Sequence, residues 1–138
     1  MKTKSLKLFI KQKKIEIERL LARITPLKLE IEELQKRLRH NEEQIQVLEK
    51  RPAQRLFDLA LSHSHIGDLR SQNEKILAKM ERLQSEISVL QKELSELFGQ
   101  KKGLEKLLER TIHQQEKKAN EEENRLADES YLRKIHTS

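Results

Sequence analysis

Three of the five histidines could ligate a metal ion, namely His40, His63 and His65. A zinc site needs three or four nitrogen, sulfur or carboxylate ligands, and neighbouring groups must orient them. The sequence has no cysteine, and no cluster of carboxylates accompanies these histidines. We therefore predict that His63 and His65 lie in a solvated turn, and we expect no metal site and no other cofactor.

Glycine spacing is the second feature that could indicate chemistry. Gly99 and Gly103 have the G-x-x-x-G spacing, but their segment is polar, so the meaning of this spacing in membrane helices does not apply. The sequence contains no G-x-x-x-x-G-K-[ST] phosphate loop. We expect no nucleotide site, no small-molecule substrate and no enzymatic activity. The glycines themselves are either tolerated exposed residues, a weak point in a helix, or a place where a partner approaches closely.

Positive charge is concentrated near the amino terminus. The net charge is +6, and six lysines precede the first acidic residue, Glu16, so the rest of the chain sums to zero. These lysines are Lys2, Lys4, Lys7, Lys11, Lys13 and Lys14. Basic chains commonly bind nucleic acid or a membrane surface, but here the basicity belongs to one end. The apolar stretch Leu6–Ile10 is interrupted by Lys7, so we expect no signal peptide, and no apolar run is long enough for membrane insertion.

The composition favours long helices over a compact layered domain. Charged residues make up 38% of the chain and aromatic residues only 3%, with two prolines and three glycines. Because large aromatic side chains are so few, apolar residues must meet along a narrow seam rather than in a broad core. The expected fold class is all-α.

Apolar residues recur at alternating steps of three and four in two long stretches, which is the heptad pattern of a coiled coil. The first seam runs through Leu6, Ile10, Lys13, Ile17, Leu20, Ile24, Leu27, Ile31, Leu34, Leu38, Asn41, Ile45 and Leu48. The second runs through Ile66, Leu69, Asn73, Ile76, Met80, Leu83, Ile87, Leu90, Leu94, Leu97, Lys101, Leu104, Leu108 and Thr111. Pro26 falls at an outward position without disturbing the phase, so we predict one continuous, kinked first helix.

The segment between the two seams contains the features of a chain reversal. Pro52 interrupts the helical pattern, and residues 62–67 are rich in turn formers. We predict a tip at residues 51–65, in which Ala53–Leu61 forms a short helix of its own. Four apolar tip residues either cap the end of the seam or dock a partner, and both interpretations stay open. They are Leu56, Phe57, Leu59 and Leu61.

The polar residues of the seams define an antiparallel register. If Asn41 faces Asn73, the two residue numbers of each layer add to 114. The same rule places Lys13 opposite Lys101 and Thr3 opposite Thr111, so every polar interruption meets another. Other registers would bury polar groups against apolar ones. The Lys13–Lys101 layer is repulsive unless its long side chains carry their ammonium groups to water.

The register divides a single elongated unit, residues 1–138, into four parts. Arm one covers residues 3–50, the tip 51–65, arm two 66–111, and an extension without a pairing partner 112–138. The predicted fold is thus a long two-helix antiparallel coiled-coil hairpin with an unpaired C-terminal helical extension. The extension leaves apolar area exposed at Leu126, Tyr131, Leu132 and Ile135, which is typical of a surface that binds a partner.

The hairpin, its extension and the segment Gln100–Arg110 (QKKGLEKLLER), followed by a late Asp128-Glu129, resemble the central-stalk proteins of type III secretion systems, the FliJ and YscO family. The lysine-rich start with few aromatics favours an injectisome homologue over a flagellar one. The resemblance implies a cytoplasmic protein, peripheral to the inner-membrane export apparatus. Its terminal end would bind the export ATPase ring, and its tip would bind the export gate protein and export chaperones.

The resemblance also implies which residues make these contacts. The candidates for the ATPase contact are Lys7, Lys11, Lys14, Lys102, Lys106, Arg110 and Arg125. The candidates for docking at the tip are Arg55, Leu56, Phe57 and Leu59. Two other functions stay open beside this one: a basic coiled coil that binds nucleic acid through residues 2–14, and a parallel homodimeric scaffold. The internal register favours a chain that is monomeric when alone.

Overall fold

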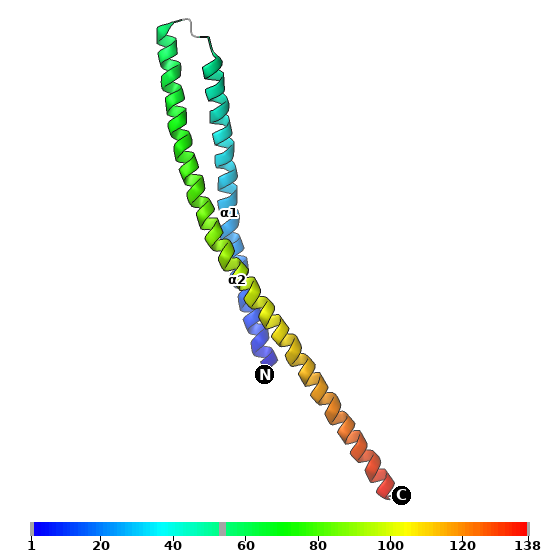
Figure 1. Cartoon of the computed structure of the whole chain (residues 1–138). Helices are drawn as coiled ribbons and strands as arrows, with labels where there is room; N and C mark the ends of the chain where they lie inside the picture. The colour runs from blue at the N-terminus through cyan, green and yellow to red at the C-terminus, as the bar shows by residue number, and fades with distance from the viewer. Residues whose placement is uncertain (1, 53–54, 138) are drawn as a thin grey trace. The chain divides into compact units, whose positions relative to one another are not determined.

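Two long helices packed against each other form the protein (Figure 1). The structure is a computed structural model that describes residues 2–52 and 55–137. Helix α1 spans Lys2–Lys50 and helix α2 spans Leu56–Thr137. The predicted all-α helical hairpin is therefore confirmed.

Contacts group the described residues into two units. The tip unit consists of Arg19–Leu94, and the terminal unit consists of the residues up to Glu18 together with those from Ser95 onward. Each unit contains a part of α1 and a part of α2. The prediction that the chain is a single elongated unit stays a prediction.

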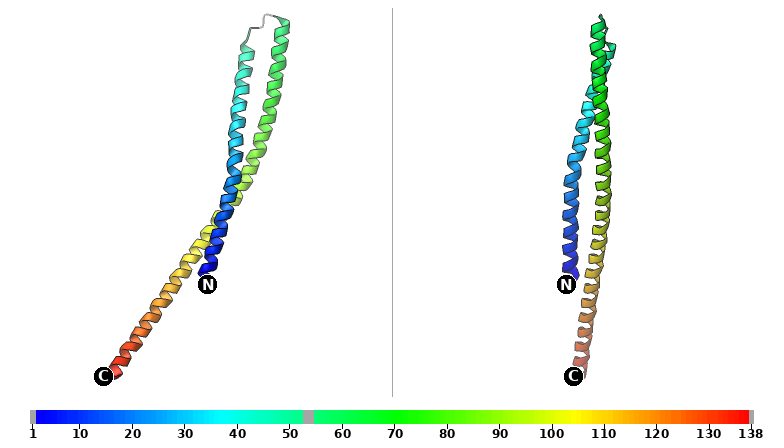
Figure 2. Two further views of the ribbon diagram at one scale, coloured as in Figure 1. Left: turned by 180° about the vertical axis from the view of Figure 1, so that it is seen from behind. Right: turned by 90° about the vertical axis from the view of Figure 1, so that its left-hand side faces the viewer.

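The buried side chains of the tip unit all come from the predicted seams. Its buried apolar residues are Leu20, Ile24, Leu34, Ile66, Leu69, Ile76, Leu83, Ile87 and Leu90. Leu34, Ile76 and Leu83 form one buried cluster, and partly buried neighbours from both helices pack against it. Figures 1 and 2 show α1 and α2 side by side through this unit. The seam is narrow because each helix packs against only one other helix. An apolar stripe with a strict 3.5-residue period is therefore wide enough to fill the contact between them.

A pair of asparagines fixes the register of the tip unit. The Asn41 side-chain nitrogen donates a hydrogen bond to the Asn73 side-chain oxygen over 3.0 Å. Asn41 is buried at 9% exposure, so its amide would lose hydrogen bonds to water if the register shifted. The predicted pairing of Asn41 with Asn73 is confirmed.

Two ion pairs between the helices agree with the same register. Lys79 contacts Glu30 at 2.9 Å, and Arg70 contacts Glu49 at 2.8 Å. Each pair joins residues beside the seam, where charges set the orientation of coiled-coil helices. All four side chains are substantially exposed, so each pair contributes little stability and serves mainly to favour this alignment.

The seam of the terminal unit follows the predicted pattern but is less buried. Among its described side chains, Ile17 is buried, at 5% exposure. The other predicted seam positions of this unit are half-buried: Thr3, Leu6, Ile10, Lys13, Leu97, Lys101, Leu104, Leu108 and Thr111. We infer that each layer of the terminal unit contributes less hydrophobic stabilisation than a layer of the tip unit.

Pro26 lies inside α1 without ending it, as predicted. Its side chain is exposed. Proline has no backbone N–H to donate to the carbonyl of Ala22, which costs about 3 kcal/mol in a helix interior. Packing of the flanking buried layers, Ile24 above all, offsets this cost.

The chain reversal lies earlier than predicted. Helix α2 already begins at Leu56, so the turn expected across residues 62–67 is wrong, and those residues form continuous helix. The prediction of a separate short helix over Ala53–Leu61 is wrong for Leu56–Leu61, which are the first residues of α2. Its first two residues, Ala53 and Gln54, lie outside the described residues. The turn-forming residues are overridden because Ile66 and Leu69 bury their side chains against α1 only if the helix passes through them.

A substitution in the central cluster tests the seam. Leu34→Ala removes a buried side chain with 5% exposure, and we expect the free energy of unfolding to fall by about 2 to 5 kcal/mol. Urea unfolding followed by circular dichroism measures the change. Leu29→Ala is the matched control, because Leu29 lies on the same helix at 56% exposure. Equal losses for the two variants would contradict the pairing described above.

Candidate functional site

Two groups of exposed residues carry the predicted contacts. We call residues 51–65 the tip, and we call six basic side chains of the terminal unit the collar. The collar consists of Lys7, Lys11, Lys14, Lys102, Lys106 and Arg110. The tip belongs to the tip unit and the collar to the terminal unit, so each is described separately.

Local backbone chemistry positions the tip. Arg51 precedes a proline and is therefore disfavoured in helical conformation, which explains why α1 ends at Lys50. The Arg51 N–H still donates to the carbonyl of Leu48 over 3.4 Å, closing the last turn. At the start of α2, the carbonyl of Arg55 accepts from the N–H of Leu59 over 3.1 Å. Asp58 lies in the first turn of α2, where its negative charge interacts favourably with the helix dipole.

The apolar side chains of the tip point to solvent. Leu56 is 85% exposed and Phe57 is 71% exposed, and both Leu59 and Leu61 are more than half exposed. Ile66 is the first buried side chain of α2. The seam therefore covers only a minor part of these four side chains, and the choice between capping and docking stays open. Their role in docking stays a prediction.

A groove lies beside this apolar cluster. It has a volume of about 600 Å³. Its lining residues from the end of α1 and the reversal are Leu48, Glu49, Arg51 and Pro52, and those from α2 are Asp58, Leu59, Leu61, Ser62, His63 and Ile66. Arg55, the remaining predicted tip residue, is exposed. The tip thus combines apolar area with the basic side chains of Arg51 and Arg55, and Lys50 directly precedes it.

The histidines do not gather into a metal site. His63 and His65 are exposed on helix α2, and because they are two residues apart they point to different sides of it. The prediction that they lie in a turn is wrong, as described above. His40 is within 3.2 Å of the Gln44 side chain. Among the residues that the structure describes, no group of three or more histidine and carboxylate side chains has the geometry to hold a metal ion.

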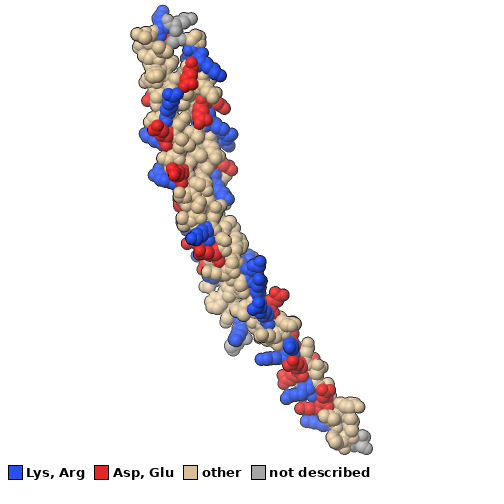
Figure 3. Space-filling model, in the orientation of Figure 1, with Lys and Arg blue, Asp and Glu red and all other residues tan. Residues whose placement is uncertain are grey.

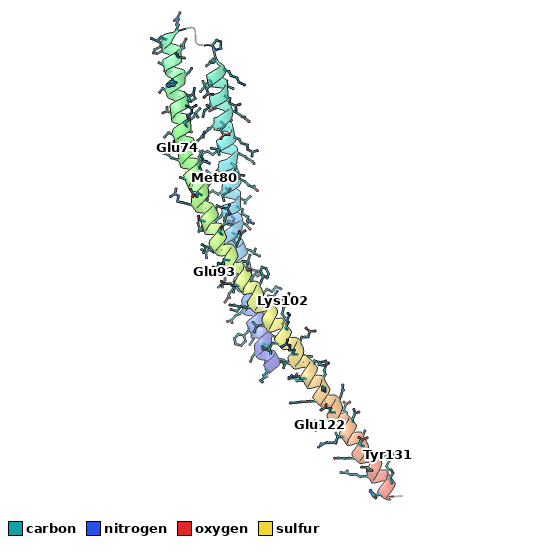
Figure 4. All side chains as sticks on the ribbon, in the orientation of Figure 1. Glu74, Met80, Glu93, Lys102, Glu122 and Tyr131 are labelled. Atoms are coloured by element: carbon teal, nitrogen blue, oxygen red, sulfur yellow. The ribbon has the colours of Figure 1, made fainter. Side chains whose placement is uncertain are left out.

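The collar residues are exposed on both helices of the terminal unit. Lys102, Lys106 and Arg110 follow one another at steps of four, so they form a basic stripe along α2. Lys7, Lys11 and Lys14 form the corresponding stripe on α1. Figure 4 labels Lys102, and Figure 3 shows lysine and arginine side chains at the surface of this part of α2.

The two seam lysines of the terminal unit are each paired with an acid of their own helix. Lys13 contacts Glu16 at 3.5 Å, and Lys101 contacts Glu105 at 3.5 Å. Their side chains keep 28% and 27% exposure, so the ammonium groups reach the edge of the seam. Each ammonium group thus has an acidic partner, which reduces the repulsion expected between the two lysines, while the pairing of Lys13 with Lys101 in one layer stays a prediction.

The C-terminal extension continues α2 as exposed helix. From residue 112 to residue 136 every side chain is exposed, and Figure 4 labels Glu122 and Tyr131 on this part of the helix. Leu126 and Tyr131 are 53% and 66% exposed. Arg125, a predicted contact residue, lies 3.8 Å from Glu122 of the preceding turn. The prediction of a helical extension is confirmed for the described residues, and the apolar side chains of Leu126, Tyr131 and Leu132 are more than half exposed.

Sequence reasoning missed the partners of the interhelical ion pairs. Glu30, Glu49, Arg70 and Lys79 were not singled out, although each lies beside a seam position. The heptad positions next to the seam were the signal that could have identified them.

Comparison of the chain with family models, with curated proteins and with solved structures finds no match. Over the described residues, no helix combines the length and the apolar content that crossing a bilayer requires.

Proposed function

We propose that this chain is a non-enzymatic stalk or coupling protein of a type III secretion system. In this proposal the collar and extension bind the export ATPase ring, while the tip binds the export gate protein and export chaperones. The observation that supports it best is the placement of accessible side chains. The paired seams leave a basic collar in the terminal unit and an apolar cluster at the tip.

The tip supports a protein-docking role through its exposed apolar area. Leu56 is 85% exposed and Phe57 is 71% exposed, so burial of these side chains by a partner lowers the free energy. Large apolar side chains surrounded by polar ones are the usual centre of a protein interface. The proposal assigns this contact to the export gate, and it assigns the chain to the cytoplasm beside the inner-membrane export apparatus.

The collar supports binding to an acidic surface. Six lysines precede Glu16 on α1, and the facing stretch of α2 adds Lys102, Lys106 and Arg110. Like charges at such density repel one another, and an acidic partner relieves that repulsion. The proposal identifies the partner as the ATPase ring.

Of the alternatives, binding of nucleic acid is favoured by the same lysines. Its weakness is the scarcity of aromatic residues for base stacking, since Phe9 and Phe98 are the only phenylalanines in the terminal unit. The parallel homodimer is disfavoured because Asn41 and Asn73 already pair within one chain.

The first expected outcome concerns the oligomeric state. Because each seam is covered within one chain, light scattering coupled to gel filtration should give the mass of a monomer, 16.4 kDa. The variant Asn41→Cys provides a further check. A stable dimer in which the cysteines at position 41 of two chains form a disulfide would contradict the hairpin.

The second expected outcome concerns the tip. Replacing Phe57 and Leu59 together by alanine should leave the melting temperature nearly unchanged, because both side chains are more than half exposed. The same variant should lose most export activity and most binding to the gate protein in a pull-down. Leu77→Ala, at 52% exposure away from the tip, is the control. A fall in melting temperature as large as that of Leu34→Ala would make the tip structural.

The third expected outcome concerns the collar. Reversing Lys7, Lys11 and Lys14 to glutamate should weaken ATPase binding and stimulation by at least tenfold, and wild-type binding should weaken as salt rises. Truncation after Ile112 should also weaken binding, while urea unfolding of the paired helices stays nearly unchanged, because the described side chains that it removes are exposed. If both variants bind and stimulate the ATPase normally but lose affinity for nucleic acid, the stalk function is wrong for this end.

A further inference from the structure

One edge of the terminal unit carries more apolar area than a two-helix coiled coil needs. Phe9 on α1 and Leu107 on α2 both occupy the heptad position that directly precedes an a residue, Ile10 and Leu108 respectively. They are 52% and 48% exposed. Two-stranded coiled coils usually carry charged residues there, whereas helices of larger bundles extend their apolar stripe to this position. This edge therefore has the pattern of a helix pair that packs against a third helix.

A groove between α1 and α2 lies along the same edge. Its volume is about 490 Å³. Its lining residues are Lys2, Ser5 and Leu6 from α1, and Leu107, Thr111 and Gln114 from α2. Leu6 and Leu107 supply the apolar surface, and the polar residues at either side are short or neutral except for Lys2. Sequence reasoning missed this groove, because it considered Leu107 only within Gln100–Arg110, the segment that carries the family resemblance.

The charge around the groove is positive. Lys2 lines it, and Arg110 lies on the same edge of α2, three residues beyond Leu107. Glu16, the acid nearest to this edge on α1, contacts Lys13 at 3.5 Å. A partner segment that fits the groove must therefore place acidic side chains beside its apolar ones.

Gly103 supports close approach at this edge. It lies one turn before Leu107, and a Cβ atom built on it would meet nothing within 4 Å. The chain's own packing thus gives no reason for a glycine, which costs about 1 kcal/mol in a helix interior relative to alanine. A glycine at this position lets the backbone of another helix approach closely.

We propose that this groove binds one acidic amphipathic helix of a partner protein, which lies against α1 and α2 and forms a short three-helix bundle with them. Leu6, Phe9 and Leu107 contact the apolar face of that helix, while Lys2 and Arg110 pair with its carboxylates. The inference deepens the proposed function, because naming the export ATPase as the source of the helix rests on that function. The groove itself stands on the geometry above.

The test uses the full-length chain and a synthetic peptide. The fluorescent peptide has about four heptads with leucine at a and d and glutamate at e and g, so that it is unfolded alone by charge repulsion. We expect wild-type protein to raise its anisotropy and helix content at low salt. Leu107→Ser and Gly103→Leu should each weaken binding about tenfold, since truncating or blocking a central contact costs on the order of 1 to 2 kcal/mol.

Matched controls separate this groove from general stickiness. Phe98→Ser removes a side chain of the same 48% exposure from the other edge of α2, and it should leave the affinity unchanged. Gly99→Leu adds a side chain on the outer face of α2, where a Cβ atom would also meet nothing within 4 Å, and it should likewise leave the affinity for the peptide unchanged. A peptide with lysine in place of glutamate should not bind.

Three results would overturn the inference. The first is failure of the acidic peptide to bind, and the second is an equal loss of peptide affinity in Phe98→Ser and Leu107→Ser. The third is a dimer of the wild-type protein in sedimentation that becomes a monomer in Gly103→Leu, because the groove would then bind a second copy of the chain. A different measurement, retention of the ATPase, tests the proposed function. If the peptide binds as expected but wild-type protein does not retain the ATPase in a pull-down, the stalk function is wrong while the groove stands.

Discussion

Burial of two narrow apolar seams against each other is the interaction on which this molecule depends. The chain has no disulfide and few aromatic residues, so the layers between α1 and α2 supply most of its hydrophobic stabilisation. Such layers are nearly interchangeable, and leucine and isoleucine alone would allow several registers. The hydrogen bond between Asn41 and Asn73 removes that freedom, because any other alignment buries an amide without its partner.

The accessible surfaces follow from this register. The lysines of residues 2–14 and those of residues 101–110 belong to the same terminal unit, and the side chains from residue 112 to residue 136 are exposed. The same alignment leaves Leu56 and Phe57 beyond the first buried layer of the tip unit, so they are exposed. Charged and apolar side chains are thus accessible near the ends of the paired helices.

The terminal unit differs from the tip unit in how firmly its seam is closed. In the tip unit most seam residues of α2 and four seam residues of α1 are buried, whereas in the terminal unit the seam is mostly half-buried and contains Lys13 and Lys101. Local opening is easier where fewer apolar contacts must be broken. A loosely packed pair with an added apolar edge is well suited to accept a third helix, because the partner then supplies burial that the pair lacks. The terminal unit is accordingly the part of this molecule whose packing a partner would complete.

The sequence by itself determined the helical class, the positions of the seams, the passage of α1 through Pro26 and the pairing of Asn41 with Asn73, since each follows from periodicity and from the cost of burying unpaired polar groups. It did not locate the start of α2, because the turn propensity of residues 62–67 is local, whereas burial of Ile66 and Leu69 against α1 is a tertiary effect that outweighs it. Only the tertiary structure decided which exposed residues share a surface. The ion pairs of Lys79 with Glu30 and of Arg70 with Glu49, and the groove between Leu6 and Leu107, depend on how two helices lie side by side. The heptad pattern specifies which stripe of each helix is buried, but the shape and charge of the edges arise only when both helices are present.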